Sequence, residues 1–163
     1  PYPSNVDMTS AESVGDLIRR LDAAGAVLAG RGLTLCYHNH QTEFYRLGGR
    51  TVLDRIYAET DPRNLQGEID TYWVQFGGGD CVALCEKLTG RMPIIHLKDY
   101  QITEKSEPRF CEVGEGNLDF RRIVAAAEAA GCQWFAVEQD VCPGDPVESL
   151  AMSFQYLSTE ICS

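Results

Sequence analysis

The chain has 163 residues, of which 44% are hydrophobic, and this is enough for one domain with its own core. Its formal net charge of -10 argues against nucleic acid as a partner, because a phosphate backbone requires a basic surface. No apolar run approaches the ~20 residues of a membrane span and no signal-peptide pattern opens the chain, so we expect a cytoplasmic protein with no membrane contact. The scatter of its seven cysteines is typical of reduced thiols.

Cap residues and the spacing of apolar side chains predict helices that alternate with strands. In chain order we expect a helix from Ser10 or Ser13 to about Gly30, a strand over 33–40, a helix over 52–59, a strand over 65–73, a helix over 80–88, a strand over 93–99, a helix over 118–130, a strand over 134–140 and a last helix from about Asp145. The polar stretch 101–116 is long enough to be a lid or a binding loop.

Four strands that alternate with helices predict a parallel sheet with right-handed crossovers. The chain is short for a closed eight-stranded barrel, which typically needs ~250 residues. We therefore expect an α/β fold made of (β/α) units of TIM-barrel type, with about four strands, as one domain over residues 1–163. Such a half-barrel leaves the inner face of its sheet uncovered, so we expect a homo-oligomer in which a second copy completes the barrel.

All three histidines lie at or near the carboxyl ends of predicted strands. His38 and His40 close LTLCYHNH, and His96 lies in PIIHLKD. Two further predicted strands carry a carboxylate near the same end, at Asp70 and Glu138. The carboxyl ends of parallel strands meet at one edge of the sheet, where sites assemble. Mixed nitrogen and oxygen ligands suit Mn, Co, Zn or Fe, so we expect one divalent ion bound by His38, Asp70, His96 and Glu138.

The identity of the first ligand and the role of Lys98 each have two or more possible assignments. Strand alternation places His40 on the same face as His38, so His40 or Glu43 could replace His38 as the first ligand. Lys98 shares its face with His96, and it either contacts the substrate or forms a surface ion pair with Asp99.

Three aromatic residues follow the second predicted strand, Tyr72, Trp73 and Phe76. They either wall a sugar-stacking pocket or pack beneath the loops. Glu115, in the glycine-flanked turn VGEG, is either a site residue or a solvated loop charge. We take His40, Trp73 and Glu115 as the candidate substrate-binding residues.

The motifs YHNHQTEF, EIDTYW, HLKD, VGEGNLDF and VEQD, in this order, resemble the sugar phosphate isomerase/epimerase superfamily, the xylose isomerase-like TIM barrels that include inosose dehydratases and ketose epimerases. The resemblance covers residues 33–157 and corresponds to the carboxyl-terminal half of those proteins. It implies a metal at the carboxyl face of a (β/α)8 barrel, with Asp70, His96 and Glu138 as ligands. The family usually has a glutamate as first ligand where this chain has His38, and many relatives have a histidine where this chain has Trp73.

The ligand set and the resemblance together predict a metal-dependent isomerase or epimerase that acts on a small carbohydrate: a keto sugar, a sugar phosphate or a keto polyol. A metal that polarises the carbonyl eases deprotonation of the neighbouring carbon to an enediolate, with Glu138 as the expected base and Lys98 as a second candidate catalytic residue. Loss of a β-hydroxyl after the same step would make the protein an inosose-type dehydratase, which is one alternative. A truncated barrel half that is inactive alone is another.

Overall fold

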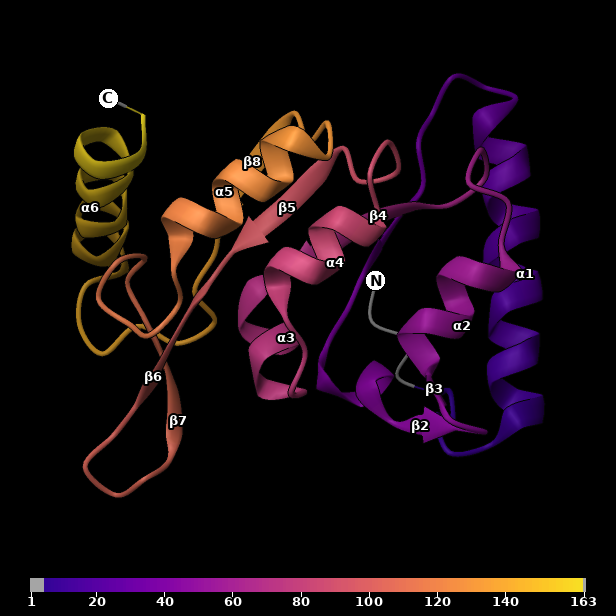
Figure 1. The fold of residues 1–163 in the computed structure, drawn as a ribbon, viewed down its shortest axis with the longest axis horizontal. Coiled ribbons are helices and arrows are strands. Elements are labelled where there is room, and N and C mark those ends of the chain that lie inside the picture. Colours follow the sequence, from indigo (N-terminus) through magenta and orange to yellow (C-terminus); the bar gives the residue numbers. More distant parts are fainter. Residues whose placement is uncertain (1–4, 163) are drawn as a thin grey trace.

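A four-stranded parallel sheet forms the centre of the molecule in the computed structural model, which describes residues 5–162 (Figure 1). Its strands lie side by side in the order β1 (Cys36–His38), β4 (Gln66–Asp70), β5 (Ile94–Leu97) and β8 (Trp134–Val137). Each neighbouring pair is parallel, and the spatial order follows the chain, as in successive (β/α) units of a TIM barrel. The predicted fold class, with four parallel strands, is confirmed.

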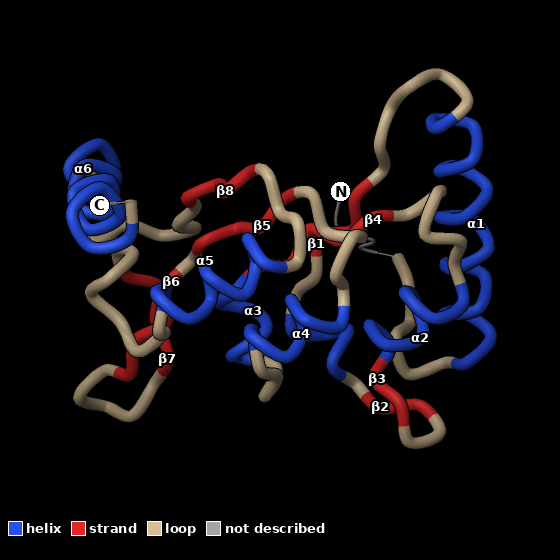
Figure 2. Tube along the Cα trace, turned by 45° about the horizontal axis from the view of Figure 1, so that its top comes forward, coloured by secondary structure: helices blue, strands red, loops and turns tan. Residues whose placement is uncertain are grey.

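The connecting helices cover one face of this sheet. Figure 2 shows α2 (Val52–Glu59), α4 (Cys81–Lys87) and α5 (Phe120–Ala129) on the same side of the strands. The first helix, α1 (Ala11–Ala29), packs against α2, and the last, α6 (Pro146–Tyr156), continues into the π-helical turn η2 (Leu157–Ile161). No helix within residues 5–162 is long and apolar enough to cross a membrane.

Cap residues determine where these helices begin. Ser10 caps α1, because its hydroxyl accepts the Ser13 N–H at 3.3 Å, so Ser10 is the start of the first helix. Asp80 caps α4 in the same way, as its spacing predicts. At α6, Asp145 is the cap and Pro146 occupies the first turn, where its missing N–H costs nothing.

Two predicted stretches contain a different kind of element from the one expected. The strand expected over 65–73 ends at Asp70, because this carboxylate accepts the Trp73 N–H at 3.1 Å and begins the short helix α3 (Thr71–Phe76). The stretch expected as a lid or loop contains a hairpin instead, in which β6 (Asp99–Ile102) pairs with antiparallel β7 (Pro108–Cys111). Phe110 on this hairpin packs on Tyr72, with ring centroids 4.1 Å apart, and this contact holds the hairpin against α3.

The first predicted strand is also shorter in the structure, since β1 has three residues and is followed by a 3-10 turn, η1 (Gln41–Phe44). Beyond it, β2 (Arg46–Leu47) and β3 (Arg50–Thr51) form a small hairpin. Gly48 and Gly49 make its turn with φ of 58° and 89°, a conformation that residues with a side chain adopt only under strain.

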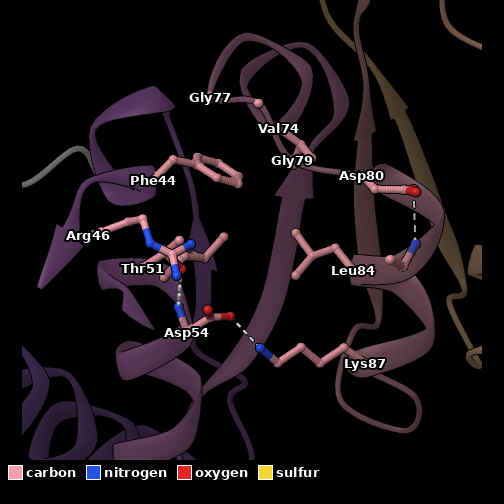
Figure 3. A pocket seen from close by; sticks show the side chains of 13 residues that line it. Phe44, Arg46, Thr51, Asp54, Val74, Gly77, Gly79, Asp80, Leu84 and Lys87 are labelled. Atoms are coloured by element: carbon pink, nitrogen blue, oxygen red, sulfur yellow. Dashed lines mark hydrogen bonds and ion pairs between the residues drawn. The ribbon is translucent and has the colours of Figure 1, made fainter. Parts of the chain in front are cut away.

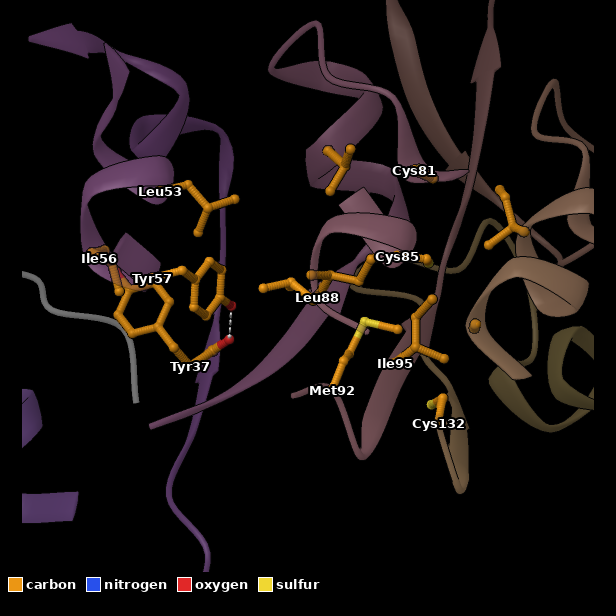
Figure 4. Close-up of a cluster of buried hydrophobic side chains, with 14 of the residues drawn as sticks. Tyr37, Leu53, Ile56, Tyr57, Cys81, Cys85, Leu88, Met92, Ile95 and Cys132 are labelled. Atoms are coloured by element: carbon orange, nitrogen blue, oxygen red, sulfur yellow. Dashed lines mark hydrogen bonds between the residues drawn. The ribbon is translucent and has the colours of Figure 1, made fainter. Parts of the chain in front are cut away.

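The two faces of the sheet differ in character. Ile69, Ile95 and Leu97 point towards the helices and are buried in the hydrophobic core. Figure 4 shows part of this core, in which α2, α4 and the sheet contribute Leu53, Ile56, Tyr57, Cys85, Leu88 and Ile95. The alternating residues point to the opposite face, which would line the interior of a closed barrel. We call this the inner face, and it carries the polar residues described next.

Candidate metal centre and active site

The four predicted metal ligands come together at the carboxyl end of the inner face. His38, Asp70, His96 and Glu138 each offer one donor atom, and these atoms lie within 4.8 Å of one another. Register explains the convergence, because His38 pairs with Glu68 across β1 and β4, and Asp70 pairs with His96 across β4 and β5. Glu138 directly follows β8. The structure brings the four residues together as expected, and their binding of a metal stays a prediction.

Both imidazoles lie between carboxylates. Nδ1 of His96 is 2.6 Å from Glu138 Oε2, and its Nε2 is 2.9 Å from Glu68 Oε1. Nε2 of His38 is 3.4 Å from Asp70 Oδ2, and its Nδ1 is 3.5 Å from Glu68 Oε1. Each histidine therefore has one nitrogen towards a candidate ligand carboxylate and the other towards Glu68.

Lys98 is the cation at the centre of this cluster. Its side chain is 1% exposed, and its Nζ lies 2.8 Å from Asp70, 3.0 Å from Asp140 and 3.1 Å from Glu138. Of the two alternatives for Lys98, the surface ion pair with Asp99 is wrong. Asp99 is buried instead and accepts backbone N–H groups from the loop that follows β7, including those of Gly114 and Gly116.

The pKa values of the cluster show that it is held together by charge. Hydrogen bonds from His38 and His96 lower the pKa of Glu68 to about 2. Burial opposes protonation of His38, but its interactions with Asp70 and Glu68 outweigh burial and raise its pKa to about 9. Burial likewise opposes the charge on Lys98, but the Asp70, Asp140 and Glu138 carboxylates together outweigh burial and raise the pKa of Lys98. The carboxylates therefore draw positive charge into the site.

These residues fit a divalent metal. Lys98 supplies a single ammonium to four carboxylates, Glu68, Asp70, Glu138 and Asp140, so a divalent cation would compensate the remaining negative charge when both imidazoles are neutral. Two imidazoles beside two carboxylates, the set identified in the sequence, match Mn, Co, Zn or Fe better than Ca, which prefers oxygen ligands.

The structure places the three alternatives for the first ligand differently, and the choice of His38 stays a prediction. It places His38 in the donor group, whereas the Glu43 carboxylate is buried and accepts hydrogen bonds from the Tyr37 hydroxyl at 2.8 Å and the His40 N–H at 2.9 Å. The His40 ring lies beside the group, 5.1 Å from the His38 ring and 5.3 Å from the Trp73 ring.

Among the other predicted substrate-binding residues, Trp73 adjoins the site and Glu115 does not. Lys98 Nζ is 5.9 Å from the centre of the Trp73 ring and 5.7 Å from that of Phe110, so both aromatic rings border the ammonium. Tyr72, in contrast, is buried and packs beneath the hairpin. Glu115 is exposed in its turn, where its carbonyl accepts a hydrogen bond from Gln101, and a role for its side chain stays a prediction.

Two acidic residues of the cluster, Glu68 and Asp140, were missed by the sequence reasoning. Both carried a signal that was not used. Glu68 lies two residues before Asp70, and Asp140 lies two residues after Glu138, so strand alternation places each on the same face as a predicted ligand.

A separate cavity of about 420 Å³ lies between α2 and α4 and contains none of these residues (Figure 3). Its lining includes Phe44, Leu84 and the loop 77–79. Four charged residues line it. Asp54 and Lys87 pair with each other, Asp80 caps α4, and Arg46 donates to the Gly49 carbonyl.

Known proteins resemble this chain in sequence and in fold. Residues 2–157 match the family described as xylose isomerase-like TIM barrel. An inosose dehydratase from Geobacillus thermodenitrificans (strain NG80-2) is 31% identical over 160 residues, which cover 86% of this chain and 52% of that protein. An inosose dehydratase from Lactiplantibacillus plantarum is 26% identical over 163 residues, covering 90% of this chain and 54% of that protein.

Solved structures agree on the fold. A sugar phosphate isomerase/epimerase from Parabacteroides distasonis superposes with a TM-score of 0.83 at 23% identity, over 95% of this chain and 55% of that one. An L-ribulose 3-epimerase superposes with a TM-score of 0.71 at 13% identity, over 94% of this chain and 56% of that one. The chain thus spans about half the length of the relatives it matches. On the strength of the family match, the chain belongs to the xylose isomerase-like TIM barrel family.

Proposed function

We propose that this chain carries the metal centre of an enzyme that removes a proton from the carbon beside the carbonyl of a keto sugar or keto polyol. The observation that carries the proposal is the convergence of His38, Asp70, His96 and Glu138, with Lys98 in contact with two of them. Membership of the family supports it, because the curated relatives that this chain matches are named inosose dehydratases.

The four residues would hold the divalent ion, which supplies polarisation of the substrate carbonyl when it is bound. Glu138 is the member of the set best placed to reach the substrate, since its side chain is 40% exposed whereas that of Asp70 is 0% exposed. Burial opposes its ionisation, but hydrogen bonds from His96 and Lys98 outweigh burial and lower its pKa. Glu138 is thus a carboxylate at neutral pH and can accept a proton from carbon.

Lys98 would act through Glu138, because its own side chain is only 1% exposed. Its pKa is raised, so it is an ammonium at neutral pH, and it lies 3.1 Å from the Glu138 carboxylate. In a dehydration, Glu138 takes the proton from carbon, the bond to the β-hydroxyl breaks, and Glu138 gives this proton to the leaving hydroxyl, so that one water leaves. The names of the curated relatives favour this outcome.

Isomerisation or epimerisation is the second candidate. It shares the first step and differs only in that the proton returns to carbon, to the neighbouring atom or to the opposite face. The exposed Glu138 carboxylate favours isomerisation, because one carboxylate can take the proton and return it to the neighbouring carbon on the same face, whereas epimerisation needs a second proton donor on the opposite face.

Proton exchange tests the shared step. Manganese-loaded protein would be incubated in D2O with a panel of inososes and keto sugars, and NMR would follow both deuterium entry beside the carbonyl and the identity of the product. We expect exchange with at least one substrate and a loss of ~100- to 10,000-fold in Glu138→Gln. Glu128→Gln, at an exposed position on α5, is the charge-matched control. Metal-loaded protein that exchanges no proton with the whole panel would contradict the proposal.

A further inference from the structure

Glu68 occupies a distinct place in the cluster. It lies on β4 with its side chain 23% exposed, two residues before Asp70 and on the same inner face, and it is not among the four converging donors. It is nevertheless in contact with both histidines of that set, so its function in the site requires a separate explanation.

The contacts of Glu68 are made by one oxygen. Oε1 lies 2.9 Å from His96 Nε2 and 3.5 Å from His38 Nδ1. The other nitrogen of each ring points the opposite way, His96 Nδ1 to Glu138 at 2.6 Å and His38 Nε2 to Asp70 at 3.4 Å. The two rings therefore have a common arrangement, with Glu68 on one side and the ligand carboxylates on the other.

The sheet register makes this arrangement possible. Glu68 pairs directly with His38 on β1, and Asp70, two residues further along β4, pairs with His96 on β5. Because β4 lies between β1 and β5, a glutamate at this position of β4 lies between both histidines. The His38 and His96 rings are themselves in edge contact, with centroids 4.6 Å apart. A single carboxylate can therefore reach both rings.

A histidine that binds a metal through one nitrogen carries a proton on the other, and that N–H needs an acceptor. A carboxylate in this position fixes the tautomer and the orientation of the ring, and its removal typically costs ~10- to 100-fold in metal affinity. We propose that Glu68 is a positioning residue for both histidine ligands: it accepts the Nε2–H of His96 and the Nδ1–H of His38, and so presents His96 Nδ1 and His38 Nε2 to the metal. This inference rests on the metal centre proposed above.

Metal affinity is the first test. Binding of Zn²⁺ to the chelator-stripped protein would be measured by isothermal titration calorimetry. We expect a ~10- to 100-fold weaker affinity in Glu68→Ala and a smaller loss in Glu68→Gln, whose amide oxygen can still accept one N–H. Glu128→Gln, which removes the same charge from an exposed position, should bind as the parent does. Unchanged affinity in both Glu68 variants would overturn the inference.

Asp70→Ala separates this inference from the metal centre itself. If Asp70→Ala binds Zn²⁺ as tightly as the parent, the metal centre is wrongly placed. If Asp70→Ala loses the metal while Glu68→Ala retains full affinity, the centre stands and only the role of Glu68 is wrong. Circular dichroism of each variant reports whether the fold is intact.

Histidine ¹⁵N spectra give a readout that a merely structural role would not move. In cadmium-loaded protein, we expect coupling of ¹¹³Cd to Nδ1 of His96 and to Nε2 of His38, with a proton on the remaining nitrogen of each. Glu68→Gln should shift the resonances of these N–H groups. Coupling through His96 Nε2 and His38 Nδ1 would place the metal on the side of Glu68, make Glu68 a ligand and overturn the proposal.

Discussion

The ammonium of Lys98 lies 2.8 Å from the carboxylate of Asp70, and both side chains are withdrawn from solvent. A buried ion pair of this kind is weak support for stability, because removing two charges from water costs about as much as their attraction returns. Removing only one partner is different, since the other charge is then left buried without compensation. Because both residues belong to the candidate metal centre, a substitution of either one should change the stability of the fold as well as the site.

Lys98→Met should destabilise the metal-free protein by ~3 to 5 kcal/mol, because it leaves the Asp70 carboxylate without its nearest cation. Urea unfolding in the presence of a chelator measures this loss. Lys87→Met is the matched control: it breaks an ion pair with Asp54 at the surface and should cost below ~1 kcal/mol. Equal effects of the two variants would contradict the assignment of Lys98 to a buried pair.

Metal content should depend on the four converging residues. Protein purified without chelator should contain close to one divalent ion per chain, and the double variant Asp70→Ala, His96→Ala should contain none, because half of the donor set is gone. Elemental analysis checks this. His40→Ala is the control that tests the identity of the first ligand, and it should keep the metal. Undiminished metal in the double variant would show that the ion binds elsewhere.

The pH dependence of the metal-free protein should follow His38 and Glu68. The folded pKa of His38, about 9, exceeds its ordinary value of 6.5, so its contribution to stability is full below pH 6.5 and is lost as pH rises through 9. The folded pKa of Glu68, about 2, is below its ordinary value of 4.5, so its contribution is lost as pH falls from 4.5 to 2.

Urea unfolding with a chelator should therefore show greatest stability between about pH 4.5 and 6.5 from these two groups. His38→Gln should reduce the loss above pH 6.5, whereas His40→Gln should leave it in place, because burial lowers the pKa of His40. If His38→Gln loses as much stability above pH 6.5 as the parent does, the ion pairs described for this residue would be contradicted.

The cysteines should differ sharply in reactivity. Burial raises the pKa of Cys81, and it raises those of Cys85 and Cys111 to about 12, so these thiols are both protonated and inaccessible. Cys162 is exposed. Labelling with a thiol reagent at pH 7.5, read by peptide mass spectrometry, should modify Cys162 quickly and the three buried residues only after urea is added. Rapid labelling of Cys85 in the native protein would contradict the core described for α4.

Self-association stays a prediction, and the structure supplies two apolar surfaces that motivate it. Trp134 on the inner face is 68% exposed, and α6 exposes Val147 and Phe154 while it buries Ser149 and Ser153. A second copy that closed the barrel would cover the inner face. Analytical ultracentrifugation should show a dimer that Trp134→Lys weakens and that Val27→Lys, on α1, does not. A stable monomer near 18.1 kDa at high concentration would contradict the prediction.

The positions of the central strands could be predicted from the sequence alone. Apolar runs that end in His38, Asp70, His96 or Glu138 indicate strands whose carboxyl ends share one edge, because parallel strands all point the same way. The same alternation predicts which residues share a face, and it placed Lys98 beside His96 correctly. These are local properties of the chain, which is why they could be derived before the fold was known.

The contacts between strands were decided only by the tertiary structure. Alternation states which face Glu68 occupies, but its contact with both His38 and His96 depends on the register of β4 against β1 and β5. The hairpin of β6 and β7 likewise depends on the packing of Phe110 against Tyr72, two residues far apart in the chain. Local sequence determines the direction of a side chain, whereas the distance between two side chains on different strands is set by how the whole sheet packs.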